Sequence, residues 1–157
     1  MSINVRGALI GAAKDFLINN SSIDTDSGTI VNLPVLDTSC IAWENVNFDK
    51  ANKETWAKVF YVPNQPTGRT IGDKGYNELS GFMQIDFNVT TGKGEETLIN
   101  WEKKAEIYFH AGRSFSKNGQ GVIITSSGMG QGRIIGNFYR KSLTVAFRCD
   151  IKRKKVI

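Results

Sequence analysis

The sequence predicts a single α+β domain in which an N-terminal and a central helix flank a mainly antiparallel sheet. Three observations support this class: the chain has 157 residues, helical and strand periodicities occur in separate runs, and a central helix divides the strands into two groups. A chain of this length supports one hydrophobic core. We therefore assign residues 1–151 to one domain and residues 152–157 to a basic C-terminal tail.

The first expected element is an amphipathic helix over residues 5–17. Its apolar residues recur at intervals of three and four, which is the spacing of one buried helix face. The expected N-cap is Ser2 or Asn4, and the Asn-Asn-Ser-Ser run at 19–22 ends the helix. A polar loop is expected to follow as far as Pro34.

Four segments before the central helix are expected to be extended or irregular. Residues 40–45 and 55–62 read as strands, the second because it is rich in aromatic and β-branched residues. Residues 63–75 contain Gly, Pro and polar residues, and they are expected to form a long mobile loop. Residues 80–89 alternate in polarity, as in a half-buried antiparallel strand. Its buried face is expected to carry Met83, Ile85, Phe87 and Val89.

The central helix is expected over residues 95–110, followed by two strands. Its apolar stripe consists of Leu98, Trp101, Ala105, Tyr108 and Phe109. Acidic residues at its start and His110 at its end complement the helix dipole, and Gly112 is the expected C′ residue. The closing strands are expected at 121–125 and 142–151, with a glycine-rich turn at 128–132 between them.

The composition is that of a globular protein: 40% of residues are hydrophobic and 22% are charged. No run approaches the ~18 apolar residues of a membrane span, and the first residues do not resemble a secretory signal. Cys40 and Cys149 are too few for a disulfide framework and are expected to be reduced thiols. With His110 as the single histidine, histidine-based metal sites and Ser-His-Asp chemistry are not expected. We expect no cofactor.

The net charge of +5 arises from 20 Lys and Arg against 15 Asp and Glu. Four of these bases form the terminal run Lys152, Arg153, Lys154 and Lys155, so the rest of the chain is nearly neutral. The run is expected to project beyond the last paired residue and to contact an acidic protein rim rather than DNA. Glycine-rich segments at 68–74 and 128–133 lack complete phosphate-loop patterns, so we read them as turns.

Other candidate sites have simpler structural interpretations. Residues 91–95 precede a helix, but the adjacent glutamates favour a helix start over an anion site. The carboxylates Asp86, Asp150 and Glu44 are expected to be solvated or paired with cations such as Arg148 rather than catalytic. Trp43, Trp56 and Trp101 are expected in the core rather than as a base-stacking platform.

Several short motifs in a fixed order carry a family resemblance. The motifs are Ile-Ala-Trp-Glu-Asn at 41–45, Gly-Phe-Met-Gln-Ile-Asp at 81–86, Gly-Lys-Gly at 92–94 before the helix, and Asn-Phe-Tyr-Arg at 137–140 before the last strand. From about residue 41 to 150 the chain resembles the tail terminator, or tail completion, proteins of long-tailed bacteriophages. It departs from that pattern at 47–49, where Asn-Phe-Asp stands in place of an expected proline.

The resemblance implies a structural virion protein with no enzymatic activity. Such proteins form a hexameric ring that ends tail-tube polymerisation and joins the tail to the head. The implied partners are further copies of the chain, the tail tube protein and the head–tail connector protein, while DNA passes through the ring without specific binding. The implied location is the head-proximal end of the virion tail, after assembly in the host cytoplasm, with no membrane involved. The candidate assembly contacts are Gln65, Arg69, Lys74, Lys93, Arg133, Lys152, Arg153, Lys154 and Lys155.

Three other interpretations remain open at this stage. Another phage neck or head–tail connector protein would share the size and ring symmetry. A small nucleic-acid-binding module is favoured by the basic tail and the aromatic residues. A small hydrolase is the weakest alternative.

Overall fold

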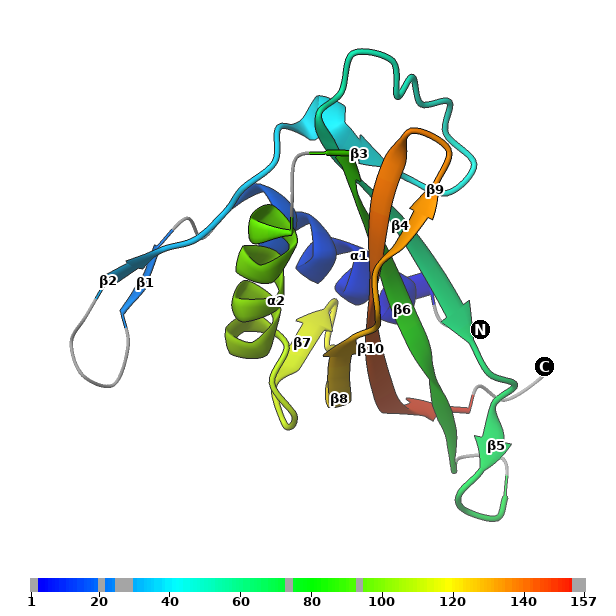
Figure 1. Ribbon diagram of the computed structural model, residues 1–157. Helices are drawn as coiled ribbons and strands as arrows, with labels where there is room; N and C mark the ends of the chain where they lie inside the picture. The colour runs from blue at the N-terminus through cyan, green and yellow to red at the C-terminus, as the bar shows by residue number, and fades with distance from the viewer. Residues whose placement is uncertain (1–2, 20–21, 25–29, 73–74, 93–94, 154–157) are drawn as a thin grey trace.

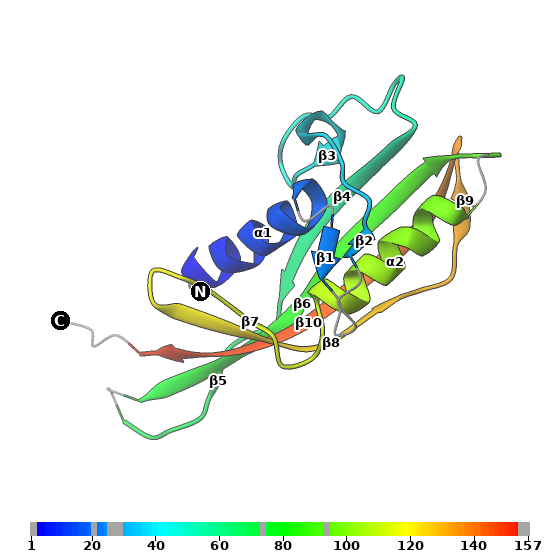
Figure 2. The same cartoon turned by 90° about the vertical axis from the view of Figure 1, so that its left-hand side faces the viewer.

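The computed structural model describes residues 3–19, 22–24, 30–72, 75–92 and 95–153. It confirms the predicted α+β class and the mainly antiparallel sheet. In the described chain, two helices lie on the same face of an eight-stranded sheet (Figures 1 and 2). Neither of the two α-helices of the described residues lies on the other face of the sheet.

The sheet is built around two long central strands. β6 (Tyr76–Thr90) and β10 (Phe138–Lys152) pair antiparallel along their full lengths. The strand order is β3-β4-β6-β10-β8-β7, with β5 added to β6 and β9 to β10, and only the β3–β4 pair is parallel. The other strands are β3 (Ile41–Ala42), β4 (Thr55–Pro63), β5 (Thr67–Gly68), β7 (Ser114–Lys117), β8 (Gln120–Met129) and β9 (Arg133–Ile135).

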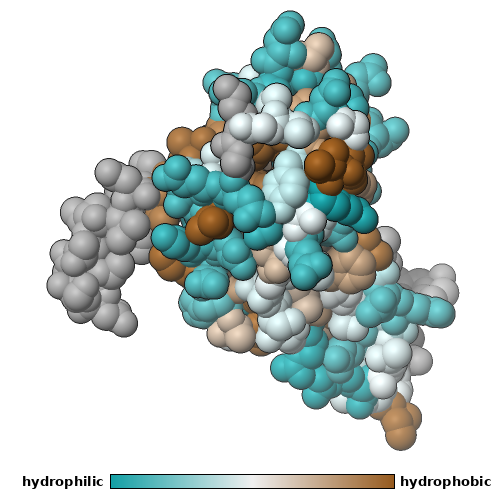
Figure 3. Space-filling view, in the orientation of Figure 1, coloured by the Kyte–Doolittle hydropathy of each residue, from teal (hydrophilic) through white to brown (hydrophobic). Residues whose placement is uncertain are grey.

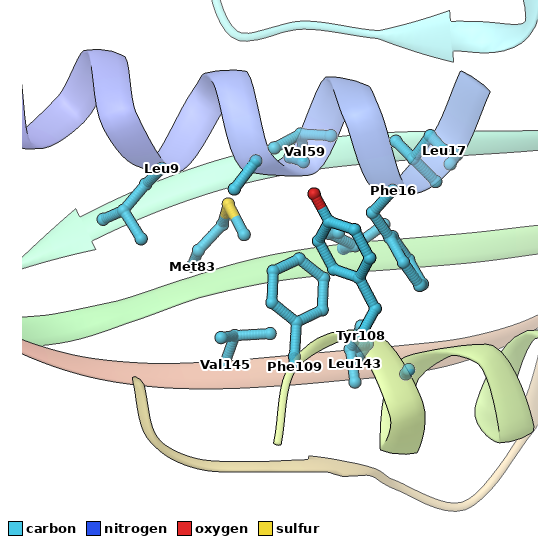
Figure 4. Close-up of a cluster of buried hydrophobic side chains, with 14 of the residues drawn as sticks. Leu9, Phe16, Leu17, Val59, Met83, Tyr108, Phe109, Leu143 and Val145 are labelled. Atoms are coloured by element: carbon cyan, nitrogen blue, oxygen red, sulfur yellow. The ribbon is translucent and has the colours of Figure 1, made fainter. Parts of the chain in front are cut away.

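The core lies between this sheet and the helices α1 (Ile3–Ile18) and α2 (Glu96–Tyr108). Every apolar residue predicted for the two helix faces is buried. Phe16 of α1 is central, because its ring centroid lies 5.5 Å from that of Trp101 and 4.9 Å from that of Phe109. Figure 4 shows Phe16 and Tyr108 among side chains from β4, β6 and β10. The alternation predicted for residues 80–89 is confirmed on this face.

The segment between α1 and β3 differs from the predicted polar loop. It contains β1 (Ser22–Asp24) and β2 (Ile30–Asn32), which pair only with each other in the described chain. Three-residue strands are too short to produce a readable alternation in sequence. α1 also begins at Ile3, so Asn4 lies inside the helix rather than at its cap, and Ser2 lies outside the described residues.

Several other boundaries also need correction. The strand expected at 40–45 is only β3, preceded by the 3₁₀ helix η1 (Thr38–Cys40), and the expected irregular loop at 63–75 contains β5. α2 ends at Tyr108 and is capped by Phe109, so Gly112 is not the C′ residue. β7 and β9 were not expected, and β8 and β10 are longer than predicted. Asn118 and Gly119 both have positive φ values (51° and 81°) and join β7 to β8 in a tight turn.

Candidate assembly surfaces

A charged cluster lies at one end of the sheet, where β5, the start of β6 and the end of β10 meet. We call this region the hairpin end; it comprises residues 67–72, 75–78 and 150–153. Arg69 lies 3.1 Å from Glu78 and 3.6 Å from Asp150. The guanidinium of Arg153 donates to the Thr70 carbonyl and, at 3.1 Å, to Asn77 Oδ1. These contacts tie the β5–β6 turn to the last strand.

The hairpin end overturns the expectation of a wholly free basic tail. Lys152 is part of β10 and lies opposite Tyr76, and the Arg153 amide donates to the Gly75 carbonyl at 2.8 Å. The ladder continues past residue 151 because β6 itself extends back to Tyr76. Residues Lys154 and Lys155 lie outside the described residues.

The structure brings three of the nine predicted contact residues together: Arg69, Lys152 and Arg153. Gln65 is exposed just before β5, and Arg133 is exposed on β9, which pairs near the other end of the β6–β10 ladder. Lys74 and Lys93 fall outside the described residues. Sequence reasoning missed Ile71, a fully exposed apolar residue in the β5–β6 turn. In Figure 3 a brown spot marks the surface over this turn at the lower end of the molecule.

The open face of the sheet carries a buried polar network. Asp86 and Asn88 are 4% and 0% exposed although they alternate with the core residues of β6. Asp86 Oδ1 accepts hydrogen bonds from Gln84 (2.8 Å) and Ser142 (2.6 Å). Arg140 donates to Asn88 at 2.7 Å and lies 3.9 Å from Asp86. Asp86 was expected to be solvated or paired with a cation such as Arg148; the nearby cation is Arg140, which the β6–β10 register places opposite Asn88.

A hollow of about 930 Å³ lies beside this network, between residues 42–50 and the open face of β4. Its aromatic walls are Trp43, Phe48, Trp56 and Phe60. Lys58 places its ammonium 4.9 Å from the centroid of the Phe60 ring. Trp56 and Trp101 are buried as predicted, whereas Trp43 is only half-buried.

Helix α2 carries a buried lysine. Lys104 is 0% exposed, and its ammonium donates to the carbonyl oxygens of Asn19 and Pro34, each at 2.8 Å. It also lies 5.1 Å from the centroid of the Trp101 ring. Burial lowers the pKa of Lys104 to about 8, a fall that the nearby Asp15 carboxylate partly opposes.

The described residues contain no cluster of three or more His, Cys, Asp or Glu side chains that could hold a metal ion. Cys40 and Cys149 are free thiols, and burial raises the pKa of Cys149 to about 11, which keeps the thiol neutral at pH 7. His110 is exposed and contacts the Ala111 carbonyl. Within the described chain, no helix combines the length and apolar character needed to cross a membrane.

The fold and these surfaces define a small α+β domain with one helix-covered sheet face, one open sheet face and a charged hairpin at one end. Comparison with known proteins identifies the family. A family model described as phage tail terminator protein matches residues 30–147, and the chain belongs to that family of structural proteins of bacteriophage tails. The resemblance stated from the sequence motifs is thereby confirmed.

Solved structures support the fold assignment. Eight solved chains are similar. One of them has 13% sequence identity, a TM-score of 0.67, and a match over 94% of both chains. At that identity the likeness shows the fold alone. None of the curated proteins matches the chain.

Proposed function

We propose that this protein forms a hexameric ring on the head-proximal end of the phage tail tube. In this proposal the ring stops tube polymerisation and then presents its other side to the head–tail connector protein, while DNA passes through without specific binding. The protein acts by contact and catalyses no reaction. Its assembly takes place in the host cytoplasm, and its final place is the virion tail.

The observation that carries this proposal is the family match over residues 30–147. The shape of the domain is compatible with it. A closed ring needs a heterologous interface, in which two different surfaces of each subunit meet. The hairpin end and the opposite end of the sheet, which carries Arg133 and the aromatic hollow, are chemically different surfaces of this kind.

Electron microscopy of tail tubes incubated with the purified protein tests the proposal. We expect a six-fold ring at one end of each tube and no further growth when tube protein is added. Tubes that keep growing at both ends, with the protein bound nowhere or along their sides, would contradict it.

A nucleic-acid-binding role is the second candidate, because the net charge is +5 and Lys and Arg residues cluster near the C-terminus. Binding of that kind would weaken steeply with salt. A gel-shift series across salt concentrations distinguishes the two functions: the proposed ring protein gives no stable complex with free DNA at physiological ionic strength.

A further inference from the structure

The hairpin formed by β1 and β2, which we call the arm (residues 22–24 and 30–32), projects from the body of the protein (Figure 1). Its ladder has three residue pairs, Ser22–Asn32, Ile23–Val31 and Asp24–Ile30, and neither strand joins the main sheet in the described chain. A two-stranded hairpin is at best marginally stable alone in water, and a third strand or a packed layer stabilises it. We therefore expect the arm to pair with or pack against another surface.

The base of the arm is fixed by Lys104. Its ammonium holds the carbonyl oxygens of Asn19, just before the arm, and of Pro34, just after it. Both oxygens lie 2.8 Å from the same nitrogen, so their separation cannot exceed twice that distance. The chain thus leaves and re-enters the body at neighbouring points, which the buried lysine holds together.

The main sheet has a free edge strand, β7, to which a further strand can pair. β7 is the outer strand next to β8 and pairs with no other strand among the described residues. The tight turn at Asn118–Gly119 makes Lys117–Gln120 the closing pair of the β7–β8 ladder. Because antiparallel residues alternate between pairing inward and facing outward, the main-chain groups of Ser114 and Ser116 face the free edge. A free edge of this kind is a template for strand addition.

The free edge opens onto a groove between β7 and α1. This groove has a volume of about 460 Å³ and is lined on the α1 side by Gly7, Ala8, Gly11 and Ala12. A Cβ atom at Gly11 would meet nothing within 4 Å. The Lys117 side chain fills the space at Gly7, where a Cβ atom would lie 2.6 Å from its Cδ, and Asp15 also lines the groove. The room for an extended backbone alongside β7 therefore lies at Gly11.

We propose that the arm of one subunit adds to the β7 edge of a second copy of this chain and occupies its α1–β7 groove. Main-chain hydrogen bonds supply the contact, as in other cases of strand addition. This inference rests on the proposed ring, because it names one interface between neighbouring subunits. The first strand of the arm, β1, lies outside the family match, which begins at residue 30, and the second strand, β2, lies inside it.

Cross-linking between engineered cysteines tests the contact. In a Cys40→Ser background, Ile23→Cys or Val31→Cys is combined with Ser116→Cys, and mild oxidation is applied to capped tails and to concentrated free protein. We expect at least one pair to give disulfide-linked dimers and larger multimers. Ser126→Cys, at another exposed serine on β8, is the matched control and should give none. Absence of multimers in both preparations would overturn the proposal whether or not the protein caps tubes.

Filling the groove is the second test. Gly11→Leu should preserve or raise thermal stability, because leucine is the better helix former and the site is open. It should lower the yield of cross-linked multimers by about tenfold, the loss expected for roughly two main-chain hydrogen bonds. Lys14→Leu, at an exposed α1 position outside the groove, should leave the yield unchanged. Equal yields of cross-linked multimers for Gly11→Leu and Lys14→Leu would contradict the contact. Normal tube capping by both variants would also contradict the contact, but it would leave the proposed ring standing.

Discussion

Lys104 shows how one residue joins distant parts of this chain. It lies 85 residues from Asn19 and 70 from Pro34 in sequence, yet it hydrogen-bonds to both. Lys103 is exposed, whereas Lys104 lies three residues after Trp101 and four before Tyr108, on the buried stripe of α2. Its burial depends on carbonyl groups supplied by remote segments. Helical spacing therefore places Lys104 on the buried face of α2, but it cannot predict which carbonyl groups accept hydrogen bonds from its ammonium.

The lowered pKa of Lys104 predicts a specific pH dependence. Its folded-state pKa is about 8, against an ordinary 10.5, so between these pH values the unfolded chain holds a proton that the folded chain has released. Stability contributed by this residue therefore rises with pH across that window, by at most about 3 kcal/mol. Comparing the free energy of unfolding of wild type and Lys104→Met from pH 7.5 to 10.5 isolates the effect, because the other titrating groups cancel. Parallel profiles would show that Lys104 does not titrate in this way.

Arg153 carries the second prediction at the residue scale. It donates to Thr70 and Asn77, whereas the Lys152 side chain is exposed. We expect Arg153→Gln to lower the free energy of unfolding by about 1 kcal/mol, because charge-assisted hydrogen bonds at a partly exposed site are lost. Lys152→Gln should change it by less than about 0.5 kcal/mol. Urea denaturation compares the two, and equal effects would contradict the assigned role of Arg153.

At the scale of elements, long periodic segments were predictable and short ones were not. Both helices and the strands around residues 55–62, 80–89 and 142–151 follow from apolar periodicity, because each buries a full face against one core. Five strands, β1, β2, β3, β5 and β9, have three residues or fewer, so pairing with neighbours, rather than local pattern, defines them. The contact residues Arg69, Lys152 and Arg153 were predicted individually. Their clustering depends on the register of β5, β6 and β10.

The turn between β5 and β6 gives a prediction at this scale. The described residues between 63 and 75 contribute no side chain to the core, and we expect the turn to order fully only against a neighbouring subunit or the tube. Replacing residues 70–75 by Asn-Gly, a tight hairpin turn, removes the Thr70 and Gly75 carbonyls to which Arg153 donates. It should lower the free energy of unfolding by about 1 kcal/mol, leave the protein folded and impair tube capping. The point variant Ile71→Ser should act in the same direction. Full capping activity in both variants would show that this turn is not part of the interface.

At the scale of the whole molecule, we propose that this domain ends the growth of the tail tube. The domain has an open sheet face (Figures 1 and 2). It also has charged side chains at the hairpin end and an aromatic hollow towards the other end, and it belongs to the tail terminator family. A connector protein of the neck would act later, after tail length is already set.

The length distribution of tails made by a phage lacking this protein tests the claim most directly. Electron micrographs of such lysates should show tails longer than normal and not joined to heads, with normal length restored by supplying the wild-type protein from a plasmid. Tails of normal length that fail to join heads would assign the protein to the neck. Tails of normal length that join heads as usual would contradict the account.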